Sequence, residues 1–187
     1  MLRRILIACL LVLAPLAAGC GGEDESSADK SAQETPQSAE REGLFVDIGG
    51  LDYNVYLTRE LNVRDVEDRA YFGGPEAPRG QALYGVFMRV CNEGDQTSLS
   101  ASDFKIKDTQ GGEFEPVDLP ADNAFAYHPA RIQPKDCIPQ AGSVAALGPT
   151  GGSMLLFQLP LSATENRPLD LEITAPSRAT RAIELDI

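Results

Sequence analysis

The chain has 187 residues, of which 16 are Lys or Arg and 28 are Asp or Glu, so its formal net charge at pH 7 is -12. This length allows one folded domain. The negative charge repels phosphate backbones, and a single His leaves little material for acid–base, nucleophilic or zinc chemistry. We therefore expect neither a nucleic-acid partner nor an enzyme.

The N-terminal residues have the pattern of an export signal. Arg3 and Arg4 precede an uninterrupted apolar run over residues 5–18, which is typical of a secretory signal peptide. As a helix this run of 14 residues spans about 21 Å, less than the roughly 30 Å hydrocarbon core of a bilayer. We therefore favour a signal peptide over a permanent membrane span.

The residues that follow this run resemble a lipobox. Leu16-Ala17-Ala18-Gly19-Cys20 is similar to the processing site of bacterial lipoproteins, although Ala17 stands where that family usually has Leu. The alternative is an ordinary signal peptide followed by an unmodified Cys. The resemblance implies that residues 1–19 are removed and that Cys20 is lipidated. Two acyl chains attach a protein stably, so we expect the domain on the extracytoplasmic face of the cell membrane or on the outer membrane.

Residues 20–42 have the composition of a tether. From Gly21 to Glu42 the chain is rich in Ser, Glu, Asp, Gln and Gly, and alanines are its main apolar residues, so it cannot form a core. As a flexible coil its reach is on the order of 25 Å. The folded domain is expected over residues 43–187. Removal of Arg3 and Arg4 with the signal leaves 14 basic against 28 acidic residues, a mature charge of -14.

Two cysteines fall within the expected domain. Cys9 leaves with the signal and Cys20 is the lipid site, so Cys91 and Cys137 remain. In an exported domain this predicts one disulfide. A redox or metal pair is the alternative, but no C-x-x-C spacing and no second Cys or His cluster accompanies these residues.

Apolar residues of the 43–187 region recur with period two, which is typical of strands. Residues 169–173 and 183–187 alternate apolar and polar side chains, as strands with one solvated face do. Residues 83–91 and 154–159 are apolar on both faces and predict central strands; the pattern does not say which face of 83–91 lies toward the core. Further strands are expected at 45–48, 53–61, 117–119 and 124–127.

One hairpin can be worked out in register. A two-residue loop over 110–111 would set Lys107 against Phe114, whereas a three-residue loop over 109–111 pairs like faces. The pairs of the second arrangement are Ile106 with Phe114, Lys107 with Glu113, and Lys105 with Glu115. We therefore predict the three-residue loop, with Gly111 in the left-handed conformation.

These elements predict an all-β fold, an immunoglobulin-like β-sandwich of about seven to nine mostly antiparallel strands. Two stretches fit this pattern less well. Residues 62–80 are charged and then rich in Gly and Pro, and residues 129–148 carry Cys137. Both are expected to be long loops, which is where binding usually resides on a rigid sandwich.

The strand and turn residues also carry a family resemblance. They are Val90-Cys91-Asn92-Glu93-Gly94-Asp95, Ser102-Asp103-Phe104, Asp108, Gln110, Gly111, Phe114, Gly151-Gly152 and Leu155-Leu156-Phe157-Gln158-Leu159-Pro160. With these residues the chain is similar to the telokin-like, immunoglobulin-like domains of bacterial lipoproteins, which implies an extracytoplasmic sandwich without established catalytic residues. It departs from that pattern in its Cys91/Cys137 pair and in an insertion over 121–142.

Acidic residues of the two C-terminal strands form a candidate cation site. If these strands paired directly, like charges would face one another, and a divalent cation such as calcium would relieve the repulsion. The alternatives are that the strands are offset or lie in different sheets, or that Arg59, Arg64 or Arg181 neutralises the acids. The candidate ligands are Asp170, Glu172, Glu184 and Asp186.

The expected function is that of a non-catalytic protein-interaction or structural module of the cell envelope, without a cofactor and with an envelope protein as partner. Tyr127 and His128 are the candidate partner contacts, at the tip of a loop; the alternative is an ordinary packed aromatic. Catalysis would require His128 with Ser143, Ser153 or an Asp, and no motif of such a site is present. A divalent-cation or small-ligand binding lipoprotein is the alternative function.

Overall fold

The computed structural model describes residues 38–187. The predicted signal peptide, Cys20 and most of the predicted tether lie outside these residues. Within 38–187 no helix is both long and apolar enough to cross a membrane.

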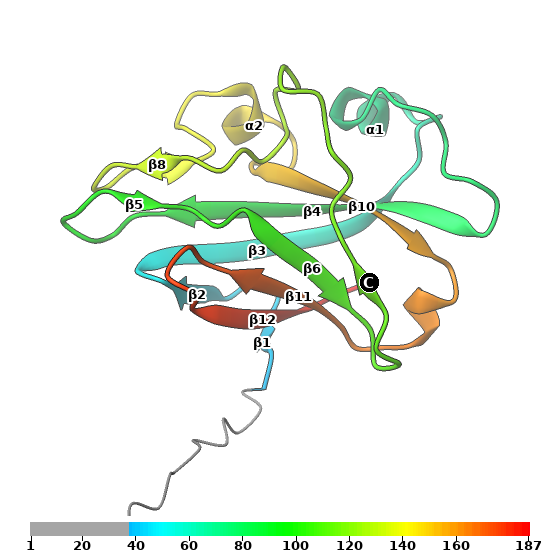
Figure 1. The fold of residues 1–187 in the computed structure, drawn as a ribbon. Helices are drawn as coiled ribbons and strands as arrows, with labels where there is room; N and C mark the ends of the chain where they lie inside the picture. The colour runs from blue at the N-terminus through cyan, green and yellow to red at the C-terminus, as the bar shows by residue number, and fades with distance from the viewer. Residues whose placement is uncertain (1–37) are drawn as a thin grey trace, which may run out of the picture. The chain divides into compact units, whose positions relative to one another are not determined.

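The first of two main sheets is built largely from the C-terminal part of the chain (Figure 1). Its neighbours are antiparallel, except that the two-residue strand β1 runs parallel to β12. The predicted alternation is confirmed, because Leu169, Leu171 and Ile173 are buried along one strand. In the neighbouring strand Ile183 and Leu185 are buried in the same way. In sheet order the strands are β1 (Glu40–Arg41), β12 (Thr180–Leu185), β11 (Leu169–Thr174), β6 (Asp103–Lys107) and β7 (Glu113–Phe114).

The second sheet is antiparallel and contains the two longest strands. Its order is β10 (Ser153–Pro160), β4 (Gln81–Cys91), β3 (Leu51–Leu61) and β2 (Phe45–Ile48), with β9 (Cys137–Ile138) added to the end of β4. A separate two-stranded ladder joins β5 (Ser98–Leu99) to β8 (Arg131–Ile132).

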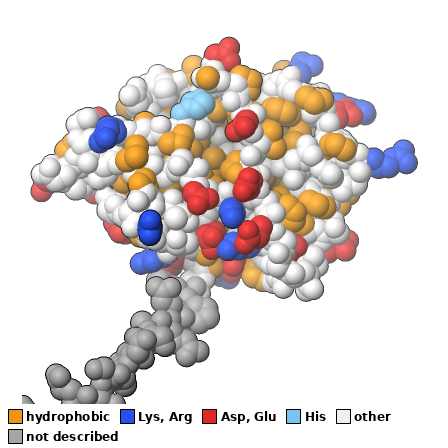
Figure 2. Space-filling model, viewed as in Figure 1, with side chains coloured by type: hydrophobic (Ala, Val, Ile, Leu, Met, Phe, Trp, Pro, Cys, Tyr) orange, Lys and Arg blue, Asp and Glu red, His pale blue; other side chains and the backbone are white. Residues whose placement is uncertain are grey.

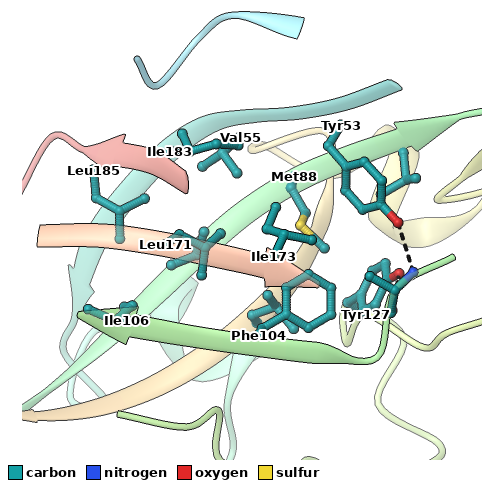
Figure 3. Close-up of a cluster of buried hydrophobic side chains, with 14 of the residues drawn as sticks. Tyr53, Val55, Met88, Phe104, Ile106, Tyr127, Leu171, Ile173, Ile183 and Leu185 are labelled. Carbon is teal, nitrogen blue, oxygen red and sulfur yellow. Dashed lines mark hydrogen bonds between the residues drawn. The ribbon is translucent and has the colours of Figure 1, made fainter. Parts of the chain in front are cut away.

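The two sheets enclose one large hydrophobic core (Figure 3). Phe104 and Ile106 of β6 and Leu171 of β11 enter it from the first sheet, and Val55 and Met88 enter it from the second. The prediction of an all-β sandwich is confirmed. Seven strands have four or more residues and form the sandwich, and the other five strands of the described region have two residues each.

Strand β4 is buried on both faces. Its sequence did not show which of the two faces lies toward the core between the sheets. Val86 and Met88 face the core between the sheets, whereas Leu83 and Phe87 face away from it and join a second hydrophobic cluster with Met154 and Leu156 of β10. A continuous apolar run is expected for a strand that is covered on both sides.

The loop over residues 62–80 covers this outer face of the second sheet. It contains helix α1 (Val66–Tyr71), which begins at the N-cap Asp65, and its Tyr71 packs edge-on against Phe87 and Phe125. The loop over 129–148 holds β8, β9 and helix α2 (Val144–Leu147). The first of the two loops predicted for binding is therefore largely a structural cover.

Several predicted strands and boundaries are wrong. No strand forms over residues 117–119 or 124–127; the only bridges to β10 in this part of the described chain are single ones, from Pro116 to Phe157 and from Ala126 to Met154. The last strand ends at Leu185, although the partly buried Ile187 still packs against the core. The fold begins before residue 43, because Glu40–Arg41 pair with β12 and the Glu42 amide donates to the Glu184 carbonyl at 3.0 Å. Backbone hydrogen bonds hold this segment, and they leave no apolar pattern in the sequence.

The predicted hairpin is confirmed at its central pairs. Ile106 lies opposite Phe114 and Lys107 opposite Glu113, and Gly111 has a φ of +86°. The predicted pair of Lys105 with Glu115 does not form, because β7 ends at Phe114 and the Lys105 ammonium instead contacts the Glu113 carboxylate at 3.3 Å.

The predicted disulfide between Cys91 and Cys137 is present. It connects the end of β4 to β9, and the two cysteines are also register partners in the sheet. The disulfide therefore holds the 129–148 loop against the end of the second sheet.

One further short element follows β10. It is the 3₁₀ helix η1 (Ala163–Glu165), which leads the chain from the second sheet back to β11 of the first.

Candidate functional site

A cleft of about 530 Å³ opens where the edges of the two sheets meet, and we name it the sheet-edge cleft. After β7 the chain leaves the first sheet and bonds to the edge of β10, where the Val117 amide donates to the Leu156 carbonyl at 2.7 Å. Farther along, the Tyr127 amide donates to the Met154 carbonyl at 2.9 Å. The lining comes from residues 102–104, 115–119, 126–129 and 154–156.

The floor of the sheet-edge cleft is apolar and rigidly held. Phe104, Tyr127 and Leu155 are buried there, and the first two rings pack edge to face with centroids 5.2 Å apart. The Tyr127 hydroxyl donates to the Ala101 carbonyl at 2.8 Å, while the Ala101 amide donates to the Tyr53 hydroxyl at 2.7 Å (Figure 3). Burial raises the pKa of the Tyr127 phenol above its usual value.

Of the two interpretations of Tyr127, the packed aromatic is the one that the structure bears out. Its side chain is 7% exposed and belongs to the main core. The local sequence could not predict the burial of Tyr127. That burial depends on Tyr53 and Phe104, which approach from two different sheets.

The rim of the sheet-edge cleft is acidic. Asp103, Glu115 and Asp118 are exposed and line it, and within residues 38–187 none of the three takes part in an ion pair. On this face hydrophobic side chains lie between acidic ones, beside the single histidine (Figure 2). The site thus combines apolar surface with three acids that form no direct ion pair in the described region.

These three acids were not among the sequence candidates. The hairpin register could have predicted part of this rim, because it places residues 103 and 115 at the same end of the β6–β7 pair. The approach of this end to β10 is a tertiary contact that no local pattern reports.

His128 is exposed on the same rim. The structure does not bring Ser143 or Ser153 into this cleft. The Ser143 hydroxyl accepts from the Ala146 amide at 3.2 Å as the N-cap of α2, and Ser153 is buried in β10. Of the groups considered for catalysis, the sheet-edge cleft therefore holds the histidine and its neighbouring carboxylates but neither serine.

The two C-terminal strands do pair directly, but their four acids do not converge. Asp170 lies opposite Glu184, whereas Glu172 lies opposite Ala182, and Asp186 follows the end of β12. Within residues 38–187 no group of three or more His, Cys, Asp or Glu side chains is arranged to hold a metal ion. The cation-site candidates are therefore not assembled into a coordination sphere.

One of these four acids, Glu172, pairs with a lysine, and none of the three arginines considered contacts any of them in the described region. The Lys107 ammonium contacts the Glu172 carboxylate at 2.9 Å and the Glu113 carboxylate at 3.3 Å. Asp170 receives no such partner: its buried Oδ1 accepts no hydrogen bond from the described residues. The arginines lie elsewhere, with Arg59 on Glu67 and Asp68, Arg64 on Glu76, and Arg181 on the Thr180 carbonyl.

No family model and no curated protein sequence matches this chain. Three solved bacterial structures resemble it. The yjhA protein of Bacillus subtilis has a TM-score of 0.49 at 10% identity, covering 79% of this chain and 99% of that one. The "putative lipoprotein (ycdA)" of B. subtilis subsp. subtilis str. 168 has a TM-score of 0.49 at 13% identity, covering 79% and 39%. An uncharacterized beta-sandwich protein of Clostridium difficile 630 has a TM-score of 0.43 at 10% identity, covering 81% and 99%.

Proposed function

We propose that this protein is an exported, lipid-anchored and non-catalytic binding module of a bacterial cell envelope. The residues around Cys20 support the anchor, and the sheet-edge cleft supports the binding role. The observation that carries the binding role is the combination of a buried, hydrogen-bonded apolar floor with three exposed acids that have no ion-pair partner in the described region.

The chemistry of the cleft indicates the kind of partner. Its apolar floor favours an aliphatic or aromatic side chain, whose burial contributes about 25 cal/mol per Å². The acids on its rim favour Lys or Arg at the edge of the contact, where complementary charge raises the association rate and the specificity more than the affinity. The partner is therefore an envelope protein that presents a basic segment with at least one large apolar side chain.

The cleft residues also support a non-catalytic role. An acyl-transfer site needs a nucleophile within hydrogen-bond reach of its base, whereas Ser143 is engaged as a helix cap and Ser153 is buried in a strand. His128 and the acids of the rim are exposed, which supports a contact with a partner at the surface.

The test is cross-linking of the anchored protein in its own cells, followed by mass spectrometry of what is recovered with it. Wild type is compared with the cleft variant D103N/E115Q/D118N and with the control variant E60Q/D95N/E165Q. The control removes the same formal charge at exposed positions outside the sheet-edge cleft.

We expect a recurrent envelope protein with wild type and with the control, and at least a tenfold lower recovery with the cleft variant. Addition of 0.5 M salt should also lower the recovery, because it screens exposed charges. Equal recovery with the cleft variant, or no recurrent partner at all, contradicts the proposal.

A further inference from the structure

A second cleft, of about 570 Å³, lies on the outer face of the second sheet, and we name it the Arg89 cleft. It is separate from the sheet-edge cleft and shares no lining residue with it. Arg89 of β4 forms one wall, residues 135–142 form another, and Ala146, Leu147 and Gly151 close it from the side of α2.

The disulfide builds this cleft. Cys91 follows Arg89 by two residues on β4, so their side chains share a face of the strand. Because Cys91 is bonded to Cys137, the wall formed by the 135–142 segment is fixed covalently to the strand that carries Arg89. The Arg89 guanidinium lies over this bond, with Nη2 3.3 Å from Cys137 Sγ.

The lining of the Arg89 cleft lacks the acidic excess of the domain. Residues 38–187 contain 13 Lys or Arg and 23 Asp or Glu, whereas this cleft is lined by Arg89 and Lys135 against one acid, Asp136. Lys135 is engaged with Glu93 at 3.3 Å. Within the described residues Arg89 forms no ion pair, and the one hydrogen bond of its side chain goes to a disulfide sulfur, which is a weak acceptor.

Arg89 therefore offers most of its five N–H donors to a ligand. A guanidinium binds an oxyanion such as a carboxylate through two parallel hydrogen bonds. Beside it lies apolar surface, since the side chain of Leu147 is 76% exposed and lines the same cleft. An anionic group and an apolar group are thus accommodated within one concave site.

We propose that the Arg89 cleft binds a carboxylate that carries an apolar side chain. Two sources share this chemistry: a small free carboxylic acid, and the C-terminal carboxylate of a polypeptide that ends in an apolar residue. Arg89 holds the carboxylate, and Ala146 and Leu147 contact the apolar group. This site is independent of the protein-binding role proposed for the sheet-edge cleft.

The test is isothermal titration calorimetry of the full-length mature protein in detergent. The ligand pair is N-acetyl-leucine and its uncharged analogue N-acetyl-leucinamide, and a second pair is a tripeptide Ala-Ala-Leu with a free or an amidated C-terminus. The variants are Arg89→Gln, Arg89→Lys and Leu147→Ser. The control is Arg131→Gln, which removes an exposed arginine of β8 that lies outside this cleft.

We expect wild type and the control to bind each acid at least tenfold more tightly than its amide. Arg89→Gln should abolish this preference, Arg89→Lys should retain part of it, and Leu147→Ser should weaken both members of a pair equally. Thermal melts identify a variant that has not folded, and the wild-type comparison of acid with amide stands without any variant. Tighter binding of the tripeptide identifies a chain terminus as the ligand, and tighter binding of N-acetyl-leucine identifies a free acid.

Three outcomes overturn the proposal: equal binding of acid and amide by wild type, an undiminished preference in Arg89→Gln, or no binding by wild type. The cleft variant D103N/E115Q/D118N should keep the carboxylate preference. Failure of the carboxylate site and failure of the protein-binding proposal are therefore distinguishable.

Discussion

Asp170 is the most poorly compensated charge of the central strands. It faces Glu184 on β12, and although Lys107 lies opposite it on β6, the lysine ammonium contacts Glu172 and Glu113. Burial, and secondarily the charge of Glu184, raise the pKa of the Asp170 carboxyl above its usual value. The folded state therefore binds this proton more tightly than the unfolded chain does.

This pKa shift determines a pH dependence. A carboxyl whose pKa is raised by folding lowers the free energy of unfolding at pH values above its folded pKa, and the penalty disappears as the pH falls through that value. At pH 7 the substitution Asp170→Asn should stabilise the domain by roughly 0.5 kcal/mol, because it removes a like-charge cross-strand pair. Below pH 4 the stability difference from wild type should shrink.

Urea denaturation at pH 7 and at pH 3.5 measures this difference, with Asp95→Asn as the matched control at an exposed acid. A destabilised Asp170→Asn variant at pH 7, or a stability gain that grows in acid, would show that the Asp170 charge stabilises the fold and would contradict this prediction.

At the scale of elements, the pairing of β11 with β12 decides the question of a cation site. Direct pairing was the arrangement in which calcium would have bridged the acids, and it does occur. The acids are nevertheless not arranged for calcium, because Lys107 pairs with Glu172 and Asp186 lies beyond the end of β12. We therefore expect the thermal midpoint to be the same in 5 mM calcium and in chelator, whereas a site filled to 100 times its Kd would add about 2.7 kcal/mol. A higher midpoint in calcium would restore the cation site.

The C-terminal residues stabilise the first sheet. Leu185 is 6% exposed, Ile187 packs against the main core, and the Asp186 amide donates to the Glu42 carboxylate at 3.1 Å. Deletion of residues 185–187 should lower the free energy of unfolding by about 3 kcal/mol, since burial of one large aliphatic side chain is worth about 1.5–3 kcal/mol. Deletion of residue 187 alone is the control and should cost less. In urea denaturation, a loss below 1 kcal/mol for the longer deletion would mean that Leu185 contributes little to the core.

At the scale of the whole molecule, the folded region carries a second covering layer on one sheet. Val63 and Phe72 of the 62–80 loop and Phe125 pack onto the outer face of the second sheet, so the apolar faces of β4 are both removed from water. Both candidate clefts lie at margins of this sheet, one at the edge of β10 and the other beside Arg89 and the disulfide.

The proposed attachment of this protein to a membrane rests on Cys20. If the proposal holds, the substitution Cys20→Ser should move the protein from the membrane fraction to the soluble fraction of its own cells, because it removes the residue proposed to carry the acyl chains. Ala17→Leu, which restores the residue usual in a lipobox, should leave the attachment unchanged. Mass spectrometry of the N-terminal peptide measures the modification directly. Cys20→Ser protein that remains with the membrane would contradict the lipid anchor.

The sequence by itself determined the strand class of the domain, the hairpin at residues 104–114 and the Cys91–Cys137 bond. These features follow from local alternation, from the matching of faces across one turn, and from the number of cysteines in a domain expected to be exported. Each of these features depends only on residues that are close in sequence or, for the disulfide, on the few cysteines present.

Only the tertiary structure decided where the surface lies. It buried Tyr127, brought Asp103, Glu115 and Asp118 to one rim, and placed Arg89 over the disulfide. The physical reason is that burial and clefts depend on which segments, distant in sequence, pack against one another. A period-two pattern reports only that a strand has two faces, and what covers each face is set by the rest of the chain.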